Sequence, residues 1–132
     1  MGITAVIRKT LIGESAAVPP SLLARFPELS IIRLRRGGLP VRIAGWSLLQ
    51  STAAAITLWN TVFLAPDTTP DADLLLHELR HVQQFQASPV FPLLYLMESV
   101  RRGYHNNRYE LDAVAFAEAR LASHRRTRIE ET

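Results

Sequence analysis

The residue types that could do chemistry are concentrated in the stretch HELRHVQQF, from His77 to Phe85. Two histidines four residues apart lie one above the other on a helix, so His77 and His81 can point a ring nitrogen at the same metal ion. Glu78 is rotated to one side of them, so its carboxylate can reach a water on that metal without binding the metal itself. Zinc lowers the pKa of such a water, and Glu78 would take its proton as the water attacks a carbonyl carbon. The stretch therefore predicts a zinc site for hydrolysis.

This spacing is the HExxH pattern of metallopeptidases, whose zinc needs a third protein ligand. The chain has no cysteine, so that ligand must be a histidine or a carboxylate. The candidates downstream are Glu98, His105, Glu110, Asp112 and His124.

Glu110 is the preferred third ligand. It shares a helix face with an apolar stripe rich in alanine, where an uncompensated carboxylate would be costly. Asp112 points to nearly the opposite side of that helix, and His105 is the main rival as ligand. The alternative role for Glu110, in the first turn of its helix, is only to complement the helix dipole.

The helix that carries HELRH has clear start and stop signals. Thr69 is expected to cap it, Pro70 suits its first turn, and Ser88-Pro89 closes it. At 100° per residue, the apolar stripe of this helix lies on a different side from His77 and His81. We therefore expect a helix that is buried on two sides, with the histidines on one of them.

The remaining elements follow from shorter signals. We expect a short helix at Pro19–Phe26 and a strand at Leu29–Arg35 that ends before Gly37-Gly38. The stretch AITLWNTVFLAP is expected to form either one strand or a tight hairpin with Asn60 at its turn. A second helix after Pro92 ends at Gly103, and a third begins near Asn106 or Asn107, either of which can cap it, leaving only TRIEET loose.

Composition limits the class of protein. A chain of 132 residues with 48% apolar content is enough for one domain, 1–132, and too short for two. A net charge of +3 is weak support for a nucleic-acid partner, so we expect none. Arg8 and Lys9 interrupt the first apolar residues, which argues against a signal peptide, and the absence of cysteine fits a cytoplasmic location. Nothing in the sequence indicates an oligomeric state.

The segment Ala44–Ala65 is long enough to cross a bilayer and carries no charge. However, it contains several polar residues, and its second half alternates as a strand does. A membrane span is therefore the less favoured interpretation.

HELRHVQQF followed by YHNNRYELDA resembles the gluzincin group of zinc metallopeptidases, in particular short bacterial proteins with a HExxHxxQ helix and an N-x-x-E-x-x-A segment. The resemblance covers roughly residues 54–118. It implies His77, His81 and Glu110 as zinc ligands and Glu78 as the general base. It also implies that AITLWNTVFLAP is the strand or hairpin whose edge pairs with an extended substrate.

Two positions depart from the family pattern. Trp59 stands where such hairpins commonly carry glycine, and Val114 stands where some gluzincins have an aspartate that orients a histidine. The group that orients the histidine here must therefore be a backbone carbonyl or another acid. A polarised carbonyl also needs a hydrogen-bond donor, for which we select Tyr104 or His105.

The sequence thus predicts an α+β, zincin-like domain: a small twisted sheet packed on an active-site helix, with a second helix that carries Glu110. The leading function is a zinc-dependent metallopeptidase that acts on a peptide or protein substrate. The alternative is a metal-stabilised module that binds a protein without catalysis. A third hypothesis is a peptidase anchored in the membrane through Ala44–Ala65.

Overall fold

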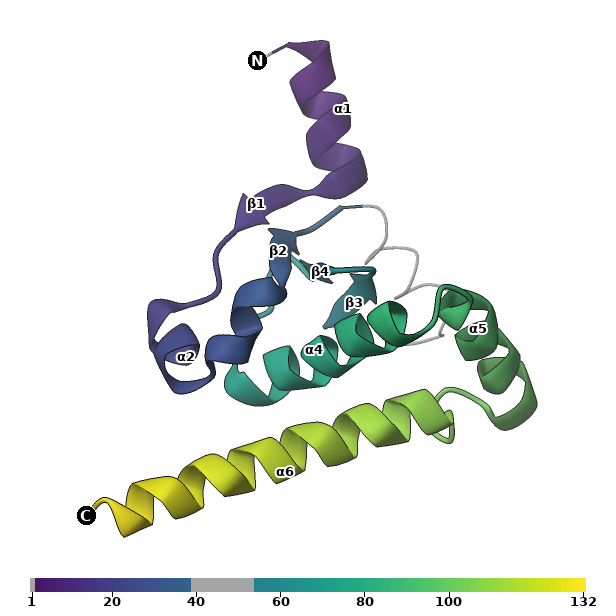
Figure 1. Cartoon of the computed structure of the whole chain (residues 1–132). Helices are drawn as coiled ribbons and strands as arrows, with labels where there is room; N and C mark the ends of the chain where they lie inside the picture. The colour runs from purple at the N-terminus through teal and green to yellow at the C-terminus, as the bar shows by residue number, and fades with distance from the viewer. Residues whose placement is uncertain (1, 39–53) are drawn as a thin grey trace.

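The fold was derived from a computed structural model that describes residues 2–38 and 54–132. In these residues a four-stranded mixed sheet combines with five α-helices and one 3₁₀ helix (Figure 1), which confirms the α+β class. The strands are β1 (Glu14–Ala16), β2 (Arg33–Arg36), β3 (Ala55–Leu58) and β4 (Thr61–Leu64). The helices are α1 (Ile3–Ile12), α2 (Pro20–Arg25), the 3₁₀ helix η1 (Pro27–Ile31), α4 (Ala72–Ala87), α5 (Phe91–Arg102) and α6 (Arg108–Glu130).

The sheet has the strand order β1-β2-β4-β3. β1 pairs with β2 in antiparallel fashion, β2 pairs with β4 in parallel, and β3 and β4 form an antiparallel hairpin. β3 is consequently an edge strand of the sheet that these residues form. This edge strand also packs against α4, the helix that carries HELRH.

Trp59 and Asn60 form the two-residue turn of the β3-β4 hairpin. Trp59 has a φ of +54°, a left-handed conformation that glycine usually supplies in such turns and that costs a larger side chain about 1–3 kcal/mol. Its ring packs against Phe85 of α4, with ring centroids 5.7 Å apart. The sequence left open a single strand or a hairpin, and the structure has the hairpin.

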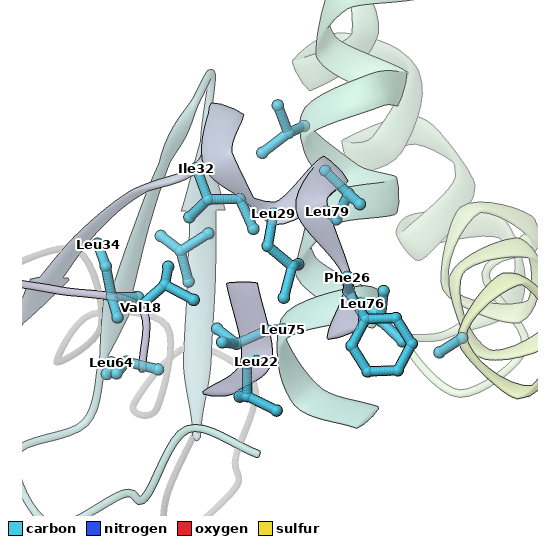
Figure 2. Packing of buried hydrophobic residues seen from close by; sticks show 13 residues of the cluster. Val18, Leu22, Phe26, Leu29, Ile32, Leu34, Leu64, Leu75, Leu76 and Leu79 are labelled. Atoms are coloured by element: carbon cyan, nitrogen blue, oxygen red, sulfur yellow. The ribbon is translucent and has the colours of Figure 1, made fainter. Parts of the chain in front are cut away.

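α4 lies between the sheet and the long helix α6 (Figure 1). Toward the sheet it buries Leu75 and Leu79, and Leu76 lies beside Phe26; all three leucines belong to the main hydrophobic core (Figure 2). Toward α6 it meets Ala113 and Ala117, which are both buried and whose small side chains let the two helix backbones approach closely. The predicted burial of this helix on two sides is thus confirmed.

Residues 2–38 contribute more to this core than their sequence indicates. Figure 2 shows Val18, Leu22, Phe26, Leu29, Ile32 and Leu34 packed together with the leucines of α4. The short helix was predicted correctly within one residue at each end. The strand expected at Leu29–Arg35 begins only at Arg33, because Pro27 starts a 3₁₀ turn that buries Leu29 in the core instead.

α4 is capped by Asp71 and not by Thr69, so the predicted cap is wrong. The Asp71 carboxylate accepts a hydrogen bond of 2.8 Å from the backbone N–H of Leu74, and Asp73 adds a negative charge near the positive end of the helix. The helix ends at Ala87, and Ser88-Pro89 follows it directly, as expected.

Asn107 caps α6 and joins it to α5. Its side-chain oxygen accepts from the backbone N–H of Tyr109 at 2.9 Å, and its amide donates to the carbonyl of Tyr95 and the hydroxyl of Ser99. This asparagine is completely buried, so it fixes the turn that brings α6 back along α4. At the other end, α6 continues to Glu130 through residues expected to be loose, where arginine and glutamate are good helix formers.

The possible membrane segment Ala44–Ala65 is only partly covered, because residues 44–53 lie outside the described residues. Its second half forms the β3-β4 hairpin. In residues 2–38 and 54–132 no helix has the length and apolar character that a membrane span requires.

Candidate metal centre

α4 places His77 and His81 on the side that faces α6. Their ring centroids are 5.0 Å apart, as expected for residues separated by one helical turn. His81 is buried and His77 is half-buried. The two side chains are therefore held where water has limited access.

Glu110 comes from the first turn of α6 and meets both histidines. One carboxylate oxygen lies 2.9 Å from Nε2 of His77, and the other lies 3.0 Å from Nε2 of His81. Potential ligand atoms of the three residues all lie within 4.8 Å of one another. Among the described residues, His77, His81 and Glu110 are the histidine and carboxylate side chains that converge in this way. Glu110 is the residue that the sequence analysis preferred as the third ligand.

In this cluster, Glu110 and His81 each shift the pKa of the other. Burial favours the neutral carboxyl of Glu110, but hydrogen bonds from His77, His81 and Tyr95 outweigh it and hold the pKa of Glu110 well below its usual range. Burial likewise opposes a charge on His81, yet the hydrogen bond to Glu110 and the charge of Glu78 raise the pKa of His81 to about 9. Negative charge is thus concentrated around the imidazole rings, as a cation site requires.

Two imidazoles and one carboxylate are a donor set that zinc accepts. Ligand atoms about 2.0–2.1 Å from a tetrahedral ion are about 3.3 Å apart. Both nitrogens point toward the carboxylate at 2.9 and 3.0 Å, so small side-chain rotations suffice to place all three around one ion. The residues fit zinc, and the geometry is equally open to other divalent metals of this size.

Glu78 lies beside the cluster without being part of it. Its carboxylate accepts a hydrogen bond of 2.6 Å from the hydroxyl of Thr57 on the edge strand β3. Both side chains are buried, so the contact is shielded from solvent. The sequence selected Glu78 by its spacing, whereas Thr57 gave no signal, because this contact depends on how β3 packs against α4.

Tyr95 is a residue of the site that sequence reasoning missed. Its hydroxyl donates to Glu110 at 2.7 Å, and its ring meets that of His81 edge-on at 6.1 Å. Burial, followed by the charge of Glu110, raises the pKa of Tyr95 far above its usual value, so the hydroxyl keeps its proton. The signal that could have identified Tyr95 is its polar hydroxyl on the inward face of α5.

Tyr104 and His105, the predicted hydrogen-bond donors, occupy different environments. Tyr104 is half-buried, and burial together with the charges of Glu110 and Glu78 raises its pKa above the usual value. His105 is exposed and stacks edge-on against the ring of Tyr104. The charges of Glu110 and Glu78 therefore act on the Tyr104 hydroxyl, whereas the ring of His105 contacts Tyr104.

The other candidate ligands pair with arginines. Glu98 is buried on α5 with Arg102 3.1 Å from one oxygen, and His124 lies near the exposed end of α6 beside Arg25. Asp112 was expected on nearly the opposite side of its helix from Glu110. It lies outside the cluster, on the flank of α6 where the long side chain of Arg80 reaches it from α4 at 2.7 Å.

Gln84, three residues after His81, supplies the orienting group that the sequence left unnamed. Its side-chain oxygen lies 2.8 Å from Nδ1 of His81, on the opposite side of the ring from Glu110. The expected backbone carbonyl or acid is thus replaced by an amide. Gln84 is the glutamine of the HExxHxxQ pattern, and its i, i+3 spacing from His81 was the signal that could have identified it.

In a comparison with protein families, residues 26–89 match the family described as the eCIS core domain. The eCIS core domain is a metallopeptidase-like domain of extracellular contractile injection systems. The match covers slightly less than half of the chain and includes His77, Glu78, His81 and Gln84, but it ends before Glu110. Comparison with curated proteins found no match, and neither did comparison with solved structures.

Proposed function

We propose that the protein is a zinc-dependent metallopeptidase of the gluzincin type. The observation that carries the proposal is the convergence of His77, His81 and Glu110 beside a buried glutamate that is not itself part of the cluster. This is the arrangement that hydrolysis needs, with three ligands and a separate base. The match to a metallopeptidase-like family supports it, because that match covers both histidines and Glu78.

In this proposal zinc would supply Lewis-acid chemistry, which polarises a carbonyl and lowers the pKa of water. Glu78 accepts a proton from the attacking water and passes it to the leaving amine, so one water is consumed for each peptide bond broken. The hydroxyl of Thr57 keeps the Glu78 carboxylate in one orientation during both transfers. Tyr104 donates a hydrogen bond to the carbonyl oxygen as negative charge builds on it.

The substrate is proposed to bind as an extended chain along β3. This strand is an edge of the sheet, and its residue Thr57 contacts the general base directly. Backbone pairing along an edge strand fixes a peptide without reading much of its sequence. We therefore expect unfolded proteins to be better substrates than folded ones.

The test combines metal content with turnover. Purified wild-type protein should contain about one zinc per chain by elemental analysis, and Glu110→Ala should lose it, because two histidines alone hold zinc weakly. Glu78→Gln should retain zinc while cleavage of a panel of unfolded proteins falls by at least about 10²-fold, the usual contribution of a general base. Glu118→Gln, an exposed position on α6, is the matched control and should cleave at the wild-type rate. Equal cleavage by the Glu78 and Glu118 variants would refute the role assigned to Glu78.

One observation favours the alternative, a metal-stabilised protein-binding module. The outer face of α5 exposes Leu93, Leu96, Met97 and Val100, which lie on one stripe at helical spacing. Exposed apolar stripes of this kind commonly mark a surface that binds another protein. If zinc is present and no unfolded protein is cleaved, this function replaces the enzyme; cleavage that stops when a chelator is added supports the enzyme.

A further inference from the structure

Three side chains outside the metal cluster form a chain of hydrogen bonds behind His81. Gln84 contacts His81, Asp112 contacts Gln84, and Arg80 contacts Asp112. Two of these residues lie on α4 and Asp112 lies on α6. The chain therefore starts at a ligand and ends in an ion pair between the two helices that carry the ligands.

The orientation of the Gln84 amide is determined by its partners. Its nitrogen donates to the backbone carbonyl of Tyr109 at 3.1 Å and to the carboxylate of Asp112 at 3.0 Å. Both partners can only accept, so the amide oxygen must be the atom that faces Nδ1 of His81. An oxygen in that position accepts a hydrogen bond and cannot donate one. Nδ1 of His81 consequently carries a hydrogen, and Nε2 is the nitrogen available to a metal.

Asp112 is in turn held by Arg80. The guanidinium contacts both carboxylate oxygens, at 2.7 and 3.3 Å, in a two-point arrangement that fixes the carboxylate plane. This contact leaves Asp112 little freedom to turn away from Gln84.

We propose that Gln84 is a positioning residue, which holds His81 so that its Nε2 is the nitrogen that binds the metal, and that Asp112 acts through Gln84. The inference rests on the metal centre of the proposed function. A neutral amide suits this place, because Glu78 and Glu110 already put two negative charges near His81 and Asp112 adds a third on the far side. A carboxylate at position 84 would meet Asp112 as a like charge at hydrogen-bond distance.

The first experiment measures zinc affinity by competition with a chromophoric chelator. Gln84→Met keeps the length of the side chain and removes its hydrogen bonds, and it should weaken zinc binding by about 10–100-fold, as loss of such partners usually does. Gln86→Met is the matched control, because Gln86 is exposed on the same helix, and it should bind zinc within twofold of wild type. Equal zinc affinity of the two variants would overturn the proposal.

Two further readouts separate positioning from a general loss of structure. In the zinc-loaded protein, ¹⁵N NMR should show the hydrogen of His81 on Nδ1 in wild type, and a mixture of ring forms or a changed Nδ1 shift in Gln84→Met. Asp112→Asn should weaken zinc binding less than Gln84→Met, and the double variant should bind no more weakly than Gln84→Met alone, since Asp112 acts through Gln84. Additive losses would overturn the role of Asp112. If Gln84→Met does not fold, the test rests on Asp112→Asn, and an unchanged zinc affinity in that variant would overturn the proposal.

The outcomes also distinguish this inference from the proposed function. Weakened zinc binding in Gln84→Met together with unchanged cleavage by Glu78→Gln would refute the role of Glu78 as general base and leave the positioning role of Gln84 intact. Wild-type zinc affinity in Gln84→Met together with loss of cleavage in Glu78→Gln would refute the positioning role of Gln84 and leave the role of Glu78 intact. A wild-type protein that does not bind zinc would refute both.

Discussion

The hydrogen bond between Thr57 and Glu78 allows a quantitative prediction for the variant Thr57→Val. Valine has nearly the same shape as threonine, so the main change is the loss of a 2.6 Å hydrogen bond to a carboxylate between two buried side chains. A hydrogen bond to a charged group contributes about 1.5–3 kcal/mol, and a newly buried methyl group returns at most about 0.8 kcal/mol. We therefore expect the free energy of unfolding to fall by about 1–2 kcal/mol.

Thermal unfolding is the assay. An unfolding entropy of about 2.1 cal/mol/K per residue means that a chain of 132 residues loses roughly 3.6 °C in Tm per kcal/mol. Thr57→Val should thus lower Tm by about 4–7 °C. Thr61→Val is the matched control on the neighbouring strand, because its hydroxyl has only a 3.5 Å contact with Asn60, and its stability should stay within about 0.5 kcal/mol of wild type.

A double-mutant cycle with Glu78→Gln shows whether the loss comes from this contact. A hydrogen bond to the neutral amide of glutamine contributes only about 0.5–1.5 kcal/mol, so Thr57→Val should cost less in the Glu78→Gln background. If Thr57→Val lowers Tm no more than Thr61→Val, the hydroxyl does not support the carboxylate and the argument fails.

Two other predictions concern protons and the helix cap. Because the pKa of His81 is raised to about 9, zinc uptake at pH 7.5 should release about one proton, and the apparent zinc affinity should rise with pH until about pH 9. Titration calorimetry in buffers of different ionisation enthalpy measures the proton release, and binding heats that do not depend on the buffer would contradict it. Asn107→Ala should cost roughly 2–4 kcal/mol in urea unfolding, because it removes the cap of α6 and two further hydrogen bonds, to the Tyr95 carbonyl and the Ser99 hydroxyl, that a completely buried side chain makes. Asn106→Ala, at an exposed position, should have little effect, and similar losses in the two variants would show that the cap is unimportant.

The sequence predicted the parts of the molecule that are encoded locally. α4 was located from its apolar period and its end signals, and His77, Glu78 and His81 follow from positions along one helix. Glu110 was found because a carboxylate on an apolar stripe needs a partner, which is still a property of one helix.

What could not be predicted depends on contacts between distant segments. Thr57 reaches Glu78 only because β3 packs against α4, and Tyr95 reaches Glu110 only because Asn107 fixes the turn from α5 to α6. The 3₁₀ helix at Pro27–Ile31 replaced part of a predicted strand for the same reason: burial of Leu29 in the core outweighed its β-prone neighbours. Short apolar runs of this kind are ambiguous without tertiary context.

The candidate metal-binding triad is divided between two helices, so its geometry depends on the position of α6 along α4. His77, Glu78, His81 and Gln84 are fixed relative to one another by the backbone of α4, while Glu110 moves with α6. A slide of α6 along α4 by one residue is about 1.5 Å, enough to carry the Glu110 carboxylate out of reach of one histidine. The ion pair between Arg80 and Asp112 restrains this same slide. Under the proposed function, the register of the two helices therefore sets the metal affinity, and any partner that displaces α6 would alter that affinity while leaving the HELRH helix itself unchanged.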